Sequence, residues 1–139
     1  MNSTLKFTYV EMGYFKPWYL SQSPEKKNVV KSLIKNKQLE IVNGGWSAND
    51  EATPHFDDII DNMMVGHQFL DEEFGVKPTI GWDIDTFGHS DTNTRLFAEM
   101  GFDAMFFSRL DHNDKKWRSA NQAMTFLWRP GANHFGKQH

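Results

Sequence analysis

The chain has 139 residues, which is enough for one ordinary domain with a single hydrophobic core. Its formal net charge is −3, from 18 acidic and 15 basic side chains, so it carries no basic footprint for nucleic acid or for an anionic membrane surface. No segment approaches the roughly 18 apolar residues of a membrane-spanning helix, and the lack of cysteine excludes a disulfide framework.

The first part of the chain alternates strand and helix patterns. Residues 5–10 are rich in β-formers and predict a short strand, and the aromatic residues 14–20 predict a short helix or turn. A helix is expected to follow Ser23, a favoured N-cap residue, with Pro24 at its first position. Residues 39–43 predict the next strand, which two glycines close.

The same alternation continues toward the C-terminus. Residues 53–74 predict a longer helix that ends before a glycine, and residues 79–84 predict a buried strand. A helix is expected at about residues 91–100, followed by a strand at residues 104–108. Residues 123–128 are a candidate for a fifth strand.

This order of elements predicts the fold class. Strands that alternate with helices argue for an α/β fold with parallel strands and helical crossovers. The strands are apolar runs, as expected when both faces of a sheet are covered. A sheet of four or five parallel strands has exposed edges, and residues 131–139 have a loop-like composition. The chain therefore resembles an arc of a larger parallel barrel or sheet.

Polar and aromatic side chains follow each predicted strand. Because the C-terminal ends of parallel strands lie on one face, these side chains are expected to converge. The predicted site is acidic with aromatic walls and has no glycine-rich phosphate loop, so it suits a sugar or polyol with a metal ion rather than a nucleotide. Its candidates are Glu11, Trp46, Asn49, Asp50, Glu51, Trp82, Asp83, Asp85, Phe87, His89, Arg109 and Asp111.

Each candidate also has a purely structural interpretation, and the residues alone leave both open. Aspartate is favoured at helix starts, tryptophan is often buried, and surface ion pairs are common and weak. The alternatives are a core position for Trp82, helix entry for Asp83 and Asp85, a helix cap for Ser90 or Asp91, a local hydrogen bond for His89, and a surface pair of Arg109 with Asp111.

Residues 81–90, Gly-Trp-Asp-Ile-Asp-Thr-Phe-Gly-His-Ser, resemble the nucleophile motif of family 38 glycoside hydrolases, the class II α-mannosidases. The lysosomal type is the most similar. Blocks at residues 39–55 and 97–111 match in order, so about residues 7–130 align. The resemblance implies that residues 1–139 are part of one N-terminal catalytic domain. The implied fold is an incomplete arc of the family's seven-stranded β/α barrel, with residues 131–139 irregular.

The resemblance also implies roles for individual residues. Asp85 would be the catalytic nucleophile and a ligand of one zinc ion, and Arg109 would orient or electrostatically tune it. A retaining glycosidase uses one carboxylate as the nucleophile and a second as acid/base. Zinc would bind sugar hydroxyls and help to distort the ring. The expected substrate-side residues are Phe87, Trp46, Asp50 and Glu51.

Several parts of the family site lie outside the matched residues. The family's first zinc-binding His-x-Asp pair lies upstream, and a further zinc histidine and the acid/base aspartate lie downstream. This chain alone is therefore expected to be inactive. Two positions also depart from the family pattern. Thr86 replaces a typical proline, which removes a fixed φ, and Asp83 adds negative charge beside Asp85 where a histidine or a small residue is more usual.

The resemblance implies a parent enzyme that hydrolyses terminal α-D-mannose from N-glycan oligosaccharides. Its partners would be a mannose-containing oligosaccharide and the remainder of the catalytic domain. The family suggests a lysosome, vacuole or secretory compartment, although residues 1–6 lack the features of a signal peptide. The alternative is a non-catalytic mannose-binding or remnant module.

Overall fold

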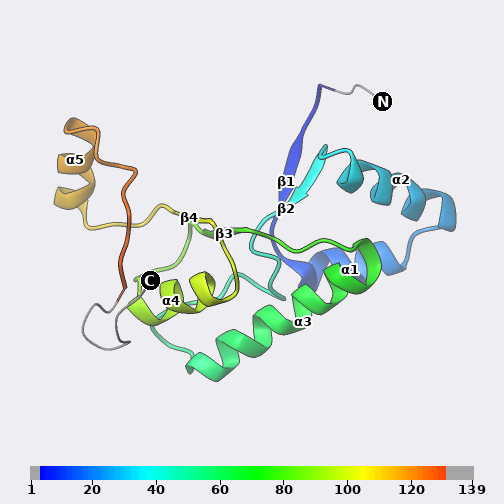
Figure 1. The fold of residues 1–139 in the computed structure, drawn as a ribbon, viewed down its shortest axis with the longest axis horizontal. Helices are drawn as coiled ribbons and strands as arrows, with labels where there is room; N and C mark the ends of the chain where they lie inside the picture. Colours follow the sequence, from blue (N-terminus) through cyan, green and yellow to red (C-terminus); the bar gives the residue numbers. More distant parts are fainter. Residues whose placement is uncertain (1–3, 131–139) are drawn as a thin grey trace.

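The computed structural model describes residues 4–130 (Figure 1). Strands and helices alternate along the chain, with one place where two helices follow each other. In order, the elements are β1 (Phe7–Tyr9), α1 (Met12–Leu20), α2 (Pro24–Lys35), β2 (Leu39–Ile41), α3 (Phe56–Phe74), β3 (Ile80–Asp83), α4 (Asp91–Glu99), β4 (Ala104–Phe107) and α5 (His112–Ala120).

The strands form two parallel pairs. β1 pairs with β2, with Phe7 opposite Leu39, and β3 pairs with β4, with Ile80 opposite Ala104. The predicted α/β class and parallel pairing are therefore confirmed for these strands. Each strand is shorter than the residue range that was predicted for it.

Asn43 connects the two strand pairs. It follows β2, adopts a left-handed conformation with φ 57°, and is fully buried. Its backbone N donates to the carbonyl oxygen of Ile80 at 2.6 Å, and its side-chain Oδ1 accepts from the backbone N of Trp82 at 3.3 Å. Asparagine tolerates this backbone region because its short polar side chain forms local hydrogen bonds. The end of β2 is thereby fixed beside β3.

The hydrophobic core lies between the first strand pair and helices α1, α2 and α3. An aromatic group at its centre joins α1 to α3, with Tyr19 and Phe74 rings at 5.0 Å and Phe15 and Phe69 rings at 6.5 Å. The buried members of this core are Met12, Phe15, Tyr19, Val30, Ile34, Ile41, Phe69 and Leu70. The predicted helix at residues 14–20 is thus real and begins earlier, at Met12.

Helix α3 packs directly on the turn that follows β2. A Cβ atom on Gly66 would stand 1.9 Å from the carbonyl oxygen of Gly44, so only glycine permits this approach. Beyond the turn, the backbone N of Trp46 donates to the carbonyl oxygen of Asn62 in the same helix at 2.9 Å. The loop that carries residues 46–51 is therefore positioned by α3.

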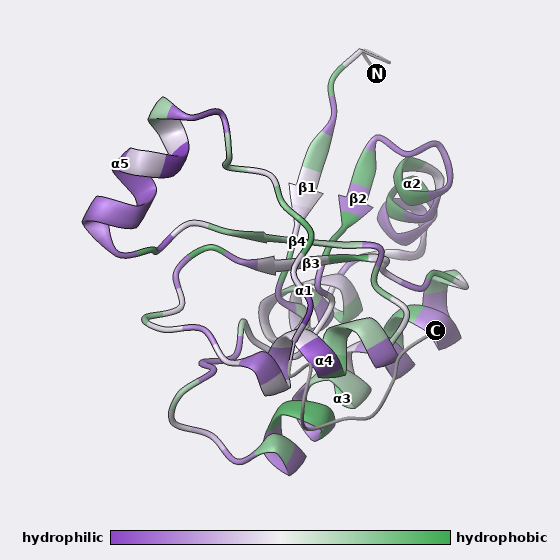
Figure 2. Ribbon diagram, turned by 60° about the vertical axis from the view of Figure 1, so that its left-hand side comes forward, coloured by the Kyte–Doolittle hydropathy of each residue, from purple (hydrophilic) through white to green (hydrophobic). Residues whose placement is uncertain are grey.

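The C-terminal part of the chain differs from two expectations. Residues 123–128 form no strand, so the candidate fifth strand is wrong; Phe126 instead packs its ring against Phe107 at 5.9 Å. Helix α5 was not predicted, because it has no buried residue and so no apolar periodicity. It is mostly hydrophilic and projects away from the other helices (Figure 2). Asp111 begins it by accepting from the backbone N of Asn113 and of Asp114.

Candidate functional site

An open pocket with a volume of about 500 Å³ lies beyond the C-terminal ends of β1, β2 and β3. Three segments line it, which are residues 10–11 after β1, residues 48–50 after β2, and residues 82–87 from β3 and the following turn. The side chains that were expected to converge therefore meet in part. Glu11, Asp50, Asp85 and Phe87 all line this pocket.

Asp85 stands at the pocket with an arginine from the next strand end. The Nε atom of Arg109 donates to Oδ1 of Asp85 at 2.9 Å, and its Nη2 atom donates to the same oxygen. The guanidinium also lies over the ring of Phe87, 4.6 Å from its centroid. The Asp85 and Arg109 side chains are 77% and 52% exposed, so both remain accessible to a ligand. Arg109 therefore pairs with Asp85 rather than with Asp111, the surface pair that was one alternative.

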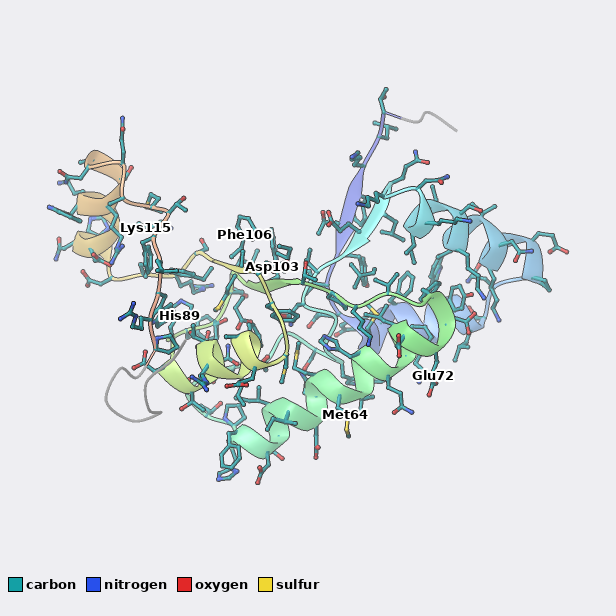
Figure 3. The ribbon with its side chains drawn as sticks, in the orientation of Figure 1. Met64, Glu72, His89, Asp103, Phe106 and Lys115 are labelled. Carbon is teal, nitrogen blue, oxygen red and sulfur yellow. The ribbon has the colours of Figure 1, made fainter. Side chains whose placement is uncertain are left out.

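A buried hydrogen bond between Glu51 and His89 lies beside this exposed ion pair. The Oε1 atom of Glu51 contacts Nδ1 of His89 at 2.9 Å, and its Oε2 atom accepts from the backbone N of Ser90 at 2.6 Å. The Glu51 side chain has no exposed surface. The Nε2 atom of His89 donates to the backbone carbonyl of Arg109 at 2.9 Å. His89 lies between the start of α4 and the segment after α5 (Figure 3).

Asp83 is buried on the inner side of the same region. Burial, and then the negative charge of Glu51, raise the pKa of Asp83 to about 7. Its Oδ2 atom accepts from Nδ2 of Asn93 at 3.2 Å, and Oδ1 of Asn93 accepts from Asn49 at 3.0 Å. The hydroxyl of Thr86 donates to the Asp83 carbonyl at 3.3 Å, so a hydrogen bond holds the turn at the position where the resemblance implies a proline.

The start of helix α4 contributes polar side chains to this region. The side chain of Ser90 accepts from the backbone N of Asn93 at 3.1 Å, so Ser90 is the N-cap that was one alternative for it. Asn93 and Phe97 are both buried and lie four residues apart on one helix face. Asn93 was missed among the candidates. An asparagine on the apolar face of a helix is the signal that would have found it.

Of Trp46, Asp50 and Glu51, only Asp50 lines the pocket. The hydroxyl of Thr53 donates to Asp50 at 2.5 Å, and this hydrogen bond lowers the pKa of Asp50. Trp46 does not line the pocket; its carbonyl accepts from the backbone N of Gly13 at 2.7 Å, and Lys16 lies 6.0 Å from its ring centroid. Glu51 does not line the pocket either, because His89 and Ser90 occupy both of its oxygens.

The described residues alone do not make a metal site. Within residues 4–130, no three histidine, aspartate or glutamate side chains are grouped so that they could hold an ion. Asp85 offers one exposed carboxylate, whereas structural and catalytic zinc sites use three or four protein ligands. Over the same residues, no helix has the length and apolar character that crossing a bilayer requires.

Comparison with known proteins places this chain among glycosidases. Residues 1–134 match the glycosyl hydrolases family 38 N-terminal domain. The chain is 51% identical over 128 residues to the lysosomal alpha-mannosidase of Dictyostelium discoideum, which covers 92% of this chain. It is 46% identical over 132 residues to an alpha-mannosidase of Canavalia ensiformis, which covers 94% of this chain. The chain spans 13% of the length of each of these relatives.

Proposed function

We propose that this chain is part of an α-mannosidase, because it belongs to the family of the glycosyl hydrolases family 38 N-terminal domain. The family resemblance inferred from residues 81–90 is confirmed by this membership. The observation that carries the proposal is the exposed Asp85 carboxylate at a pocket, held by Arg109 from the next strand end. The relatives' names support α-mannosidase as the activity.

In this proposal Asp85 is the catalytic nucleophile of a retaining reaction. Its carboxylate forms a bond to the anomeric carbon of a terminal α-D-mannose, while the glycosidic bond breaks. The departing oxygen takes a proton from an acid/base carboxylate outside this chain. Water then releases mannose from the enzyme, with that same residue acting as the base. Exposure of Asp85 supports this role, because a nucleophile must reach the sugar.

Arg109, Phe87 and Asp50 have supporting roles in the proposed site. Arg109 fixes the orientation of Asp85, because both of its hydrogen bonds end on Oδ1. Phe87 is 78% exposed beside the pair and offers a ring face to a sugar. Asp50 supplies a polar wall on the opposite loop. Substrate contact by Trp46 and Glu51 stays a prediction, since neither lines the pocket.

We further propose that Asp85 is one of several ligands of a zinc ion. When bound, zinc would supply Lewis-acid contacts to sugar hydroxyls. The rest of its ligands would come from other parts of the catalytic domain, because residues 4–130 hold no group of three. This chain alone is then expected to bind zinc weakly.

The two strand pairs are proposed to be an arc of the family's seven-stranded β/α barrel. Asn43 supports this, because its hydrogen bonds to Ile80 and Trp82 join the segment after β2 to β3. The exposed outer face of β4, where Phe106 is 55% accessible, fits a strand that the remainder of the domain covers (Figure 3). The remainder of the domain is accordingly the proposed partner of this chain.

The proposed substrate is a terminal α-D-mannose of an N-glycan oligosaccharide, and the proposed location is a lysosome or vacuole. Both rest on the relatives, among which are lysosomal alpha-mannosidases of Dictyostelium discoideum and Bos taurus. A chain that covers 13% of such relatives shares this function as a part of the whole enzyme.

Hydrolysis of an aryl α-D-mannoside tests the proposal. The full-length protein is expected to release the aryl alcohol, and Asp85→Asn is expected to abolish turnover, because a carboxamide cannot act as the nucleophile. Asp57→Asn, at an exposed carboxylate on α3, is the matched control and is expected to keep activity. The 139-residue chain alone is expected to be inactive with or without zinc. Turnover by Asp85→Asn equal to that of the wild type would sink the assignment.

A further inference from the structure

We propose that Glu51 and His89 form a positioning pair that fixes the backbone of Arg109 and so holds its guanidinium against Asp85. The inference rests on the proposed function for its consequence in catalysis, but its geometry stands on the hydrogen bonds alone. It links three loops, because Glu51 follows β2, His89 follows β3, and Arg109 follows β4.

The hydrogen-bond partners of His89 determine where its protons lie. A backbone carbonyl can only accept, so the 2.9 Å contact to Arg109 requires a proton on Nε2. The 2.9 Å contact between Nδ1 and the Glu51 carboxyl requires one further proton, which the two groups share. Glu51 also accepts from the Ser90 backbone N with its other oxygen, and whichever of the two groups carries the shared proton, the proton on Nε2 stays in place. His89 therefore presents a fixed donor to Arg109.

The His89 ring is held on several sides. Its side chain is 10% exposed, and the ring of Phe107, the last residue of β4, meets it edge-on at 4.9 Å. Trp128 contacts it at 6.4 Å, and the Trp128 indole donates to Asp91 at 3.2 Å. Because these contacts restrain the ring, its Nε2 donor occupies one place, and the Arg109 carbonyl is held there.

The two ends of Arg109 are thus fixed by different groups. Its carbonyl is held by His89, while its guanidinium stacks on Phe87 and donates to Asp85. Both side chains of the Arg109–Asp85 pair are more than half exposed, and an exposed ion pair of two flexible side chains is weak on its own. Anchoring the backbone reduces the freedom that the guanidinium loses when it binds Asp85. The buried Glu51–His89 pair in this way orders the exposed pair of Arg109 and Asp85.

The first test compares two substitutions at His89 by NMR of the chain. The amide of His89→Gln can reach the Nε2 position and keep the bond to Arg109, whereas the shorter His89→Asn can replace only the Nδ1 bond to Glu51. The readout is the side-chain Nε–H signal of Arg109, assigned by Arg109→Lys. In His89→Asn, we expect this signal to move away from its wild-type chemical shift and its proton to exchange faster with water. In His89→Gln, we expect the wild-type chemical shift and the slow exchange to be retained. Ile34→Val, a core change on α2 that lines neither the pocket nor the loop before Glu51, controls for lower stability.

Two results would overturn the positioning role. One is an Arg109 signal that is the same in the wild type, His89→Asn and His89→Gln. The other is equal loss in both variants, which would indicate a merely structural role for the histidine. A third test uses the wild type and needs no substitution. The ¹⁵N shifts of the wild-type His89 ring must show a proton on Nε2, and a bare Nε2 contradicts the proposal even where a variant does not fold.

Kinetics of the full-length protein separate this proposal from the proposed function. With an aryl α-D-mannoside, His89→Asn is expected to lower kcat by up to about 100-fold with little change in KM, because misplacement acts on the nucleophile. His89→Gln is expected to recover most of that loss. Absence of mannosidase activity in the wild type, together with the expected NMR result, would reject the function and keep the positioning pair. Mannosidase activity in the wild type, together with an unchanged kcat in His89→Asn, would reject the positioning pair and keep the proposed function.

Discussion

The two strand pairs of this chain are supported in different ways. β1 and β2 rest on a hydrophobic core that three helices share, with aromatic rings at its centre. β3 and β4 have a smaller apolar support around Phe97 and Phe102, and the loops at their ends are joined by hydrogen bonds and ion pairs. The difference teaches that the first region supplies stability, whereas the second region carries the candidate catalytic residues. The pocket lies where they meet, with walls from both.

Removing core volume from the first region should have the largest effect. Leu70 is fully buried on α3, and Leu70→Ala leaves a cavity there. We expect a loss of about 2–5 kcal/mol in the free energy of unfolding, measured by urea denaturation followed by circular dichroism. Met64→Ala, on the exposed face of the same helix, should change it by about 0.5 kcal/mol or less. Equal losses would contradict the location of the core.

Blocking the close approach of α3 to the turn after β2, within the first region, should have the next largest effect. Gly66→Ala places a Cβ atom against the Gly44 carbonyl, where the backbone has no room to yield. We expect it to cost about 1–3 kcal/mol of unfolding free energy, in spite of the higher helix propensity of alanine. Gly88→Ala is the matched control, because its Cβ would meet nothing within 4 Å. A stable Gly66→Ala variant would show that α3 is not held this closely to the turn.

The buried acid of the second region should make stability depend on pH. The pKa of Asp83 is raised from 3.8 to about 7 by burial and by Glu51, so the folded state holds a proton that the unfolded state releases. Its contribution to stability is therefore present below about pH 4 and is lost as the pH rises through about 7. One pKa unit corresponds to about 1.4 kcal/mol, so the loss is a few kcal/mol at most.

Asp83→Asn should flatten this dependence, because the amide imitates the protonated acid. The measurement is the melting temperature of the metal-free chain from pH 5 to pH 8. Carboxyls with a lowered pKa, such as Glu73, titrate below this window and do not interfere. Asp57→Asn on the surface of α3 should keep the wild-type slope. A wild-type stability that rises between pH 5 and pH 8 would contradict the assignment to Asp83.

Substituting the exposed pair should have the smallest effect on stability. Asp85→Asn removes one partner of Arg109, but both side chains are more than half exposed and water replaces the contact. We expect the free energy of unfolding to change by about 1 kcal/mol or less in urea denaturation. A much larger loss would mean that the candidate nucleophile supports the fold, and the division between the two regions would not hold.

Much of the fold could be predicted from the sequence because its signals are local. Ser23 with Pro24 marked the start of α2, and the Ser23 side chain does accept from the backbone N of Lys26. Gly75 ends α3 in the left-handed conformation that glycine favours. Helix α5 escaped prediction because a helix without a buried face leaves no apolar period. The false strand at residues 123–128 shows that β-forming residues can serve ring packing instead.

The site was predictable only as a set of residue types. The sequence alone determined the family, the alternation of strands with helices, and the presence of Asp85, Arg109 and Phe87 after predicted strands, because motifs and periodicity are written along the chain. Only the tertiary structure decided that Arg109 binds Asp85 rather than Asp111, and that Glu51 turns inward to His89. Burial and pairing depend on residues 24 and 38 positions apart, and local sequence carries no information on which of several carboxylates faces solvent.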